Sequence, residues 1–190
     1  EFISRDDILV IFDHDSTFND EYFIKLFSAI EENPDINLFV PQIYRGDLLM
    51  SPALNYYYIG KYFNGIKPGQ HSSSHMFAIN SGMAIRGKYL KGNFEGWNPK
   101  LKFYGTDNDF MFKYQRDNER LYVLDVTIQH ILNSYDITDM MSYAQRFKSQ
   151  RDAAFINMES QNFLIQVRVR MYYWLLTIKL CLKHRTLSFV

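Results

Sequence analysis

The feature that most constrains the fold is a short, wholly apolar segment near the start of the chain. Residues 8–12 read Ile-Leu-Val-Ile-Phe, with aspartates both before and after them. A continuous apolar run of this length, rich in β-branched residues and bounded by polar ones, predicts a strand that is buried on both faces. Such a strand is typical of an α/β sheet that is flanked by helices.

The segment after this strand predicts the rest of a βαβ unit. Asn19 or Asp20 can cap a helix, which the turn at residues 33–35 then ends, and residues 38–40 form a second short strand. The apolar positions of the helix recur at helical spacing: Phe23, Leu26, Phe27 and Ile30. Strand, helix and strand within about 35 residues indicate a parallel sheet.

The remaining elements are predicted from the same patterns. We expect helices over 52–63, 87–92, 108–116, 140–158 and 161–183, and strands over 76–79, 83–85 and 121–128. The strand pieces at 76–79 and 83–85 flank Asn80-Ser81-Gly82, which predicts a tight or bulged turn between them.

Two carboxylates follow the first strand. Asp13 and Asp15 stand two residues apart in a turn, and ligands of open α/β sheets bind beyond the carboxyl ends of the strands. Carboxylates this close repel each other unless a cation lies between or near them. A hard cation such as Mg²⁺ or Mn²⁺ suits the pair and would complete its shell with water and diphosphate oxygens. The alternative is that both residues only cap the next helix or form Asx turns.

Three segments in order carry a resemblance to a known family. They read ILVIFDHDSTFNDEYF, AINSGMAIRGKYL and GNFEGWNPKLKFYGTDNDFMFKYQRDNERLYVLDVTIQH. Over residues 6–136 the chain resembles glycosyltransferase family 2, in particular its bacterial rhamnosyltransferase-like branch. The resemblance implies the GT-A fold, an α/β fold with a Rossmann-type mixed sheet flanked by helices. The family's N-terminal nucleotide-binding βαβ half has no counterpart here, so we expect a catalytic part at 1–136 and a C-terminal helical extension at 137–190.

The resemblance also implies roles for individual residues. Asp13 would contact the ribose or base side of the nucleotide, and Asp15 would hold the metal. His130 matches a position that is a second metal ligand in some members of the family. Asp107 matches the general base of the family's Glu-Asp motif, although Thr106 replaces the preceding glutamate.

Further positions have weaker assignments. Asp109 falls where the family often has another acid, and Ser81 and Gly82 could bring the backbone close to the donor sugar. Each site residue has a structural alternative, since Asp107 could be a helix N-cap, His130 a hydrogen-bonded residue at a strand end, and Ser81-Gly82 a plain bulge. His14 is the variable residue of the turn, and metal contact is a minor alternative for it.

These roles predict an inverting, metal-dependent transfer of a sugar, with rhamnose suggested by the branch. The donor would be a nucleoside-diphosphate sugar and the acceptor a glycan or a lipid-linked glycan. A carboxylate that removes the acceptor's proton accelerates such a reaction by ~10²–10⁴-fold. Two other functions remain open: a non-catalytic nucleotide- or glycan-binding module on the same scaffold, and a nucleotidyltransferase on a related sheet.

The charge pattern bears on partners and location. Basic and acidic residues are equal in number, 21 Lys plus Arg and 21 Asp plus Glu, so the chain has no net positive charge to attract nucleic acid. The single cysteine excludes an internal disulfide. No acidic residue follows Glu159, and residues 163–183 combine apolar, aromatic and basic side chains. That segment predicts a helix on the membrane surface, and thus a cytoplasmic protein peripheral to the inner face of the plasma membrane. The alternative is a helix packed on the sheet or on the missing half.

Overall fold

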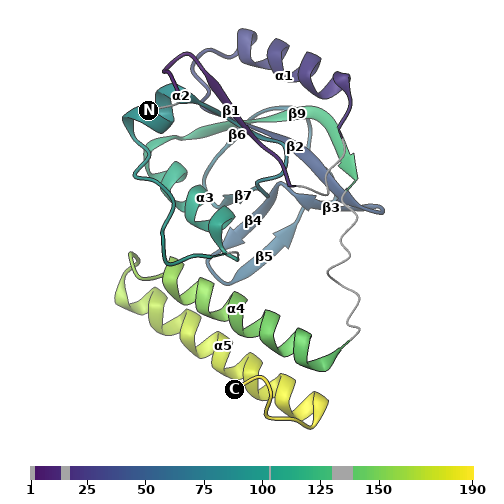
Figure 1. Ribbon diagram of the computed structural model, residues 1–190, viewed down its shortest axis with the longest axis vertical. Coiled ribbons are helices and arrows are strands. Elements are labelled where there is room, and N and C mark those ends of the chain that lie inside the picture. The colour runs from purple at the N-terminus through teal and green to yellow at the C-terminus, as the bar shows by residue number, and fades with distance from the viewer. Residues whose placement is uncertain (1–2, 14–17, 103, 130–138) are drawn as a thin grey trace.

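The computed structural model describes residues 3–13, 18–102, 104–129 and 139–190 and shows a mixed α/β fold (Figure 1). The strands are β1 (Ile8–Ile11), β2 (Leu38–Arg45), β3 (Leu48–Ser51), β4 (Ala53–Tyr56), β5 (Ile59–Tyr62), β6 (Gly69–Ser72), β7 (Met76–Phe77), β8 (Met83–Arg86) and β9 (Arg120–Gln129). The helices are α1 (Asp20–Glu32), α2 (Gly87–Gly92), α3 (Thr106–Asp117), α4 (Met140–Asn157) and α5 (Phe163–His184).

The main sheet is mixed, which confirms the mixed α/β sheet of the predicted fold class, whereas the all-parallel sheet indicated by the strand-helix-strand pattern is wrong. The strand order is β1-β8-β2-β9-β6, with β3 paired to β2. Strand β8 lies between β1 and β2 and is antiparallel to both, and its residues Ala84 and Ile85 are fully buried there. Strands β2 and β9 pair in parallel. Strands β1, β2 and β9 therefore point in the same direction and end at the same edge of the sheet.

Strand β1 forms where the apolar run predicts it, but it is only half-buried along its whole length. In the part of the chain that the structure describes, β1 is the last strand on its side of the sheet and pairs only with β8. A strand with one neighbour leaves part of its backbone and side chains open, so the expected burial on both faces is not reached.

The predicted helix over 52–63 is wrong. This segment is a hairpin of β4 and β5, which forms a second, three-stranded sheet in the order β5-β4-β7. Its aromatic and β-branched residues favour extended backbone, and Tyr57 makes the turn in the left-handed region with φ 69°. The two strand pieces around Asn80-Ser81-Gly82 thus belong to different sheets.

The other predicted helices and the strand before His130 are confirmed within a few residues at each end. In α1, the side chain of Asn19 accepts a hydrogen bond from the Tyr22 N–H, which confirms the cap. The buried face of α1 differs from the predicted one. Tyr22 and Leu26 are fully buried, whereas Phe27 is 54% exposed.

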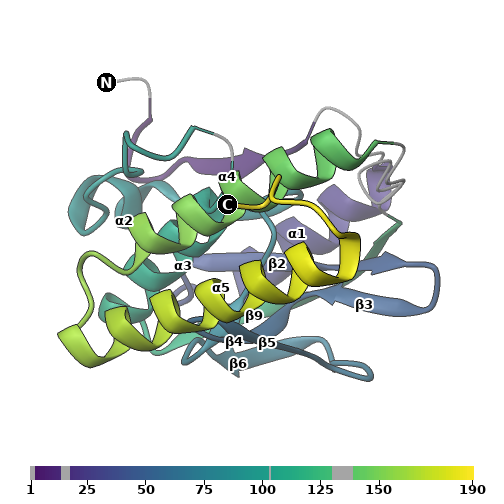
Figure 2. The same ribbon diagram turned by 90° about the horizontal axis from the view of Figure 1, so that it is seen from below.

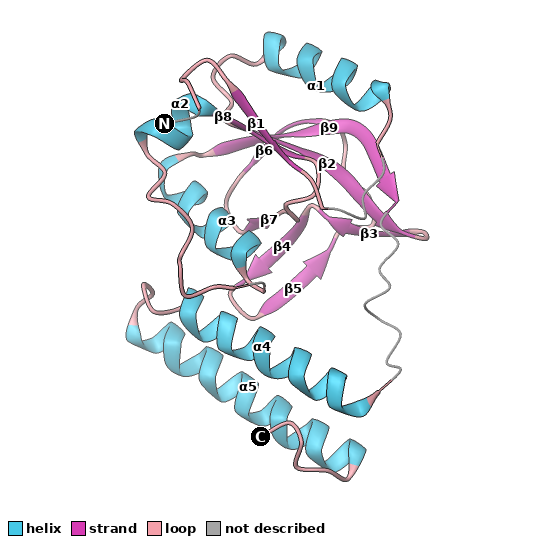
Figure 3. Cartoon of the chain, in the orientation of Figure 1, coloured by secondary structure: helices cyan, strands magenta, loops and turns pink. Residues whose placement is uncertain are grey.

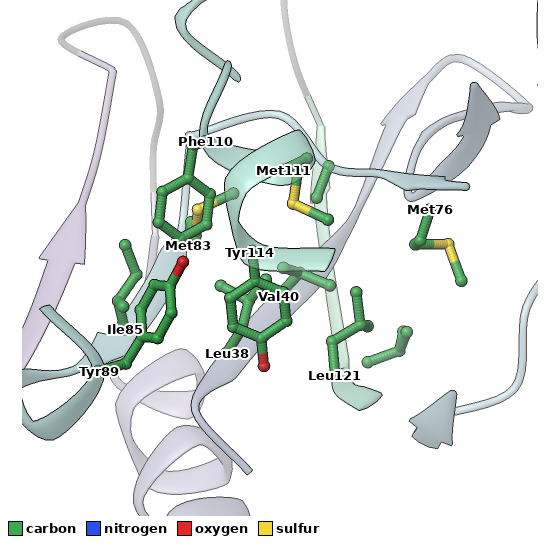
Figure 4. Packing of buried hydrophobic residues seen from close by; sticks show 12 residues of the cluster. Leu38, Val40, Met76, Met83, Ile85, Tyr89, Phe110, Met111, Tyr114 and Leu121 are labelled. Carbon is green, nitrogen blue, oxygen red and sulfur yellow. The ribbon is translucent and has the colours of Figure 1, made fainter. Parts of the chain in front are cut away.

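Two apolar layers cover the main sheet, one between the sheet and α2 and α3 and the other between the sheet and α1; Figure 3 shows where these helices lie. Alternate residues of β2 point to opposite sides, so Leu38 and Val40 join one layer and Phe39 and Ile43 the other. The first layer lies under α2 and α3, and Figure 4 shows its packed side chains. The second lies under α1.

The helices α4 and α5 pack side by side as an antiparallel pair (Figure 2). Their contacts reach the loop before α3, where the Asn157 side chain donates a hydrogen bond of 2.9 Å to the Gly105 carbonyl. Gly105 has φ +83°, and a Cβ there would lie 2.9 Å from the Ala153 Cβ. Glycine is required at this position by both its backbone conformation and the close approach of α4.

Candidate functional site

The end of β1 and the turn before β8 meet at one edge of the main sheet. Asp13 lies two residues beyond β1 and is half-buried. The Gly82 N–H donates a hydrogen bond of 2.8 Å to the carbonyl of Ile11, the last residue of that strand. The turn at residues 80–82 therefore stands directly beside the backbone that carries Asp13.

Gly82 is needed for this turn. Its φ is +73°, and a Cβ would lie 2.8 Å from the Pro41 Cγ and 3.0 Å from the Ile128 Cδ1. The Tyr22 hydroxyl donates a hydrogen bond of 2.7 Å to the Gly82 carbonyl, and Ser81 is buried. The packing of the turn explains why a serine and a glycine stand at positions 81 and 82. Contact of Ser81 and Gly82 with a donor sugar stays a prediction.

Asp107 projects from the first turn of α3 toward the same place. The N-cap of α3 is Gly105, so Asp107 is not the capping residue that the structural alternative required. The backbone N–H groups of Asn80 and of Asp107 itself lie near its carboxyl group and favour its ionised form, which lowers its pKa. The Thr106 hydroxyl adds a long contact of 3.4 Å. The turn before β8 thus links Asp13 and Asp107, which lie far apart in the sequence.

The environment of Asp107 changes its acidity. Burial, followed by the negative charge of Asp13, raises the pKa of Asp107 from 3.8 to about 6. Desolvation and a like charge are the two causes that raise a carboxyl pKa. A carboxylate with a pKa near the working pH is ionised yet basic enough to remove a proton, as a general base must be.

Asn80 is a site residue that the sequence interpretation missed. Its side-chain oxygen is buried and has no hydrogen-bond partner among the described residues. Its backbone N–H lies near the Asp107 carboxyl group and favours the ionised form of that group. Buried polar atoms are nearly always paired, so this oxygen is available to accept a hydrogen bond from a ligand. The only sequence signal was the turn itself, and a turn does not show where its side chains point.

Asp109 lies in a different environment. It is buried, accepts the Asn98 N–H at 2.9 Å and forms an ion pair of 2.9 Å with Lys113. Lys113 also donates to the Gly96 carbonyl at 2.6 Å. These contacts fasten the loop before α3 to the helix, so the structure accounts for Asp109 as a structural anchor.

Asp15, His14 and His130 lie outside the described residues, so their predicted metal contacts are untested. The described strands that precede them, β1 and β9, end at the same edge of the sheet. Within the described ranges there is no group of three or more His, Cys, Asp or Glu side chains that could hold a metal. Asp13 and Asp107 supply carboxylate oxygens, which are the ligands Mg²⁺ and Mn²⁺ prefer.

A second surface lies on α5. Large apolar side chains are exposed along this helix: Phe163, Leu164, Met171, Tyr172, Trp174, Leu175, Ile178 and Leu182. Basic residues accompany them, and no acidic residue occurs in the helix. A search of the described residues finds no helix with the length and hydropathy needed to cross a bilayer.

Comparison with protein-family models gave no match, and neither did comparison with curated proteins.

Proposed function

We propose that this chain is the catalytic part of an inverting, metal-dependent glycosyltransferase of the GT-A type. It would move a sugar from a nucleoside-diphosphate sugar to a glycan or lipid-linked glycan, and rhamnose is the first sugar to test. The observation that carries the proposal is the proximity of two carboxylates, Asp13 and Asp107, at the sheet edge where β1 ends. Burial and the charge of Asp13 raise the pKa of Asp107 to about 6.

In this proposal Asp107 acts on the acceptor. Its carboxylate takes the proton of the acceptor hydroxyl while the hydroxyl oxygen forms a bond to the anomeric carbon of the donor. On the opposite face, the bond from that carbon to the diphosphate oxygen breaks and the diphosphate leaves with the electron pair. Attack opposite to departure inverts the configuration at the anomeric carbon.

The neighbouring residues hold the two substrates. Asp13 accepts hydrogen bonds from the ribose or base side of the nucleotide, and the unpaired oxygen of Asn80 accepts one from a substrate hydroxyl. Mg²⁺ or Mn²⁺, held by Asp15 and His130, would offset the charge that develops on the diphosphate.

Replacing Asp13 by asparagine tests the nucleotide part of the proposal. We expect the chain to bind nucleoside diphosphates only with Mn²⁺ present, and Asp13→Asn to weaken this binding by about 10–100-fold. Loss of a hydrogen bond to a charged group costs roughly 1.5–3 kcal/mol, which corresponds to that factor. Calorimetric titration with UDP, dTDP and GDP measures it.

The matched control is Asp6→Asn, an exposed aspartate at the other end of β1. It should leave the affinity unchanged. An affinity for nucleoside diphosphates that Asp13→Asn leaves unchanged, or that needs no metal, contradicts the proposed role of Asp13. Metal-dependent binding with no turnover on any acceptor would favour the non-catalytic module.

We also propose that α5 lies on an anionic membrane surface, where lipid-linked acceptors are found. Its exposed apolar side chains and its excess of basic residues suit the boundary between headgroups and acyl chains. Trp174 is 65% exposed, and Trp174→Ala should weaken binding to vesicles of phosphatidylglycerol and phosphatidylcholine by about tenfold. Flotation with the vesicles measures the bound fraction.

The control is Ile59→Ala, which removes an exposed apolar side chain from β5. It should leave vesicle binding unchanged. Equal binding of the Trp174 variant and the unaltered chain, or no binding to anionic vesicles at low salt, would show that α5 has another role.

A further inference from the structure

A groove of about 830 Å³ lies away from the Asp13–Asp107 site. Its walls come from β6, the turn between β4 and β5, the last turns of α3 and the segments that follow β6 and α3. Its lining includes Tyr57, His71, His75, Phe112, Gln115 and Arg120. The volume falls within the range of small-molecule and oligosaccharide sites, roughly 300–1,000 Å³.

Aromatic rings form one wall of the groove. The Tyr57 and Phe112 rings are stacked with centroids 5.9 Å apart and an interplanar angle of 28°. The His75 ring meets Tyr57 edge-on at 6.3 Å and lies 4.7 Å from the Tyr56 ring. Each of the three rings that line the groove keeps part of its surface open to solvent. Rings arranged in this way offer a platform for the C–H face of a sugar.

The backbone is strained at this wall. Tyr57 has φ 69° and His75 has φ 56°; this left-handed conformation is uncommon for residues other than glycine and is costly for a residue as bulky as Tyr57. The two turns are joined, since the Asn55 N–H donates a hydrogen bond of 2.7 Å to the His75 carbonyl. Strain of this kind clusters at binding and active sites, where it fixes side chains in position. Two such residues on one groove wall therefore indicate a ligand site.

The other wall is polar and close to neutral. It carries amide, hydroxyl and imidazole groups together with Arg116, Glu119 and Arg120. Arg116 is paired with Glu95 at 3.2 Å, so the wall has little excess positive charge. A phosphate or nucleic-acid ligand needs such an excess, whereas a neutral polyhydroxylated ligand needs many donors and acceptors. The groove chemistry matches the second class.

The groove is separate from the proposed transfer site. Phe112 follows Asp107 by five residues in α3 and so lies about 140° around the helix from it. Arg116 lies about 180° around from Asp107 by the same geometry. The two sites therefore lie on different faces of α3.

From the ring wall, the strained turns and the neutral polar wall, we propose that this groove binds a segment of a neutral oligosaccharide. This binding does not depend on Asp13, Asp107 or a metal. It goes beyond sugar transfer, because it gives the chain a second glycan contact that can hold a polymer outside the reaction centre.

The test is a titration of the ¹⁵N-labelled chain with maltohexaose, cellohexaose and xylohexaose at millimolar concentration, without metal. We expect at least one of them to shift the amide signals of residues 57, 72–75 and 112. Tyr57→Ala should weaken that binding by about tenfold, since the ring supplies stacking and apolar contact. Tyr57→Phe keeps the ring and should bind as the unaltered chain does.

The matched control is Tyr62→Ala, which removes an exposed tyrosine from the same hairpin but outside the groove. Asp107→Asn should also retain the oligosaccharide binding, because the groove does not include Asp107. The groove proposal therefore does not depend on the proposed sugar transfer. The proposal is overturned if none of the three hexasaccharides shifts these signals. Equal affinity of the Tyr57→Ala chain, or loss of binding in Asp107→Asn, also overturns it.

Discussion

Asp107→Asn should lower the rate of sugar transfer by ~10²–10⁴-fold, the usual contribution of a positioned general base. Asparagine keeps the size of the side chain and one acceptor oxygen for the nearby backbone N–H groups, but it cannot take the proton of the acceptor hydroxyl. Donor binding should change little, because the nucleotide contacts Asp13 in the proposed geometry. Transfer from a nucleoside-diphosphate sugar to the acceptor, followed as kcat and KM separately, measures both effects.

The pH profile gives a second readout of the same residue. A base must be ionised to act, so kcat/KM should rise with pH through the pKa of Asp107, about 6. A bound divalent cation moves this limb to lower pH, since positive charge favours the carboxylate. The rising limb should be absent in the residual activity of Asp107→Asn.

The control for both readouts is Asp117→Asn, which alters an exposed aspartate in the last turn of the same helix. It should keep the full rate and the rising limb. Near-normal transfer by the Asp107→Asn chain would remove Asp107 from the mechanism.

Asp107→Asn should also make the fold more stable at neutral pH. The folded-state pKa of about 6 lies above the ordinary 3.8, so the folded chain binds this proton more tightly than the unfolded chain. Stability is therefore lost as pH rises from about 4 to about 6. A shift of about two pKa units corresponds to about 3 kcal/mol, and partial exposure of the group reduces this to roughly 1–3 kcal/mol. Urea unfolding at pH 7.5 and pH 4 measures the gain, which should vanish at the lower pH.

Asp109→Asn, two residues further along α3, should have the opposite effect. Asp109 is ion-paired with Lys113 at 2.9 Å, and both side chains are largely buried. Removing one partner leaves the other charge buried and unpaired, at a cost of about 2–4 kcal/mol. Unfolding of the two variants side by side separates the roles, and a change of the same sign in both would contradict them.

The contrast between the two aspartates reflects what stabilises each. Asp109 has a cation beside it in the folded chain, whereas Asp107 has only N–H and hydroxyl donors and a second carboxylate nearby. The ionised Asp107 therefore destabilises the folded chain, a property that groups at active sites often share.

Much of the secondary structure could be predicted from local patterns. The apolar run at 8–11, the Asn19 cap and the long helices α4 and α5 follow from residue type and spacing within a few positions. Residues 53–62 could not be assigned in this way, because a short aromatic run fits a helix or a hairpin equally well. Pairing with β7 decides for the hairpin, and that partner is distant in the sequence.

The candidate site was predictable only in part. Asp13 could be named from its position after a strand, and Asp107 from the resemblance to a family motif. Asn80 could not, because its role depends on the approach of its backbone N–H to Asp107 and on the burial of its side-chain oxygen. The groove at Tyr57, His75 and Phe112 left no pattern in the sequence, since its rings come from three separate segments.

The first strand and the aspartate after it thus follow from the sequence, because an apolar run and a polar turn are local properties. The position of β8 between β1 and β2, the approach of Asp107 to Asp13 and the raised pKa of Asp107 were decided by the tertiary structure. These features arise from the burial of distant residues against one another. Desolvation and the interaction of two charges depend on where side chains lie in space, and no spacing along the chain specifies that.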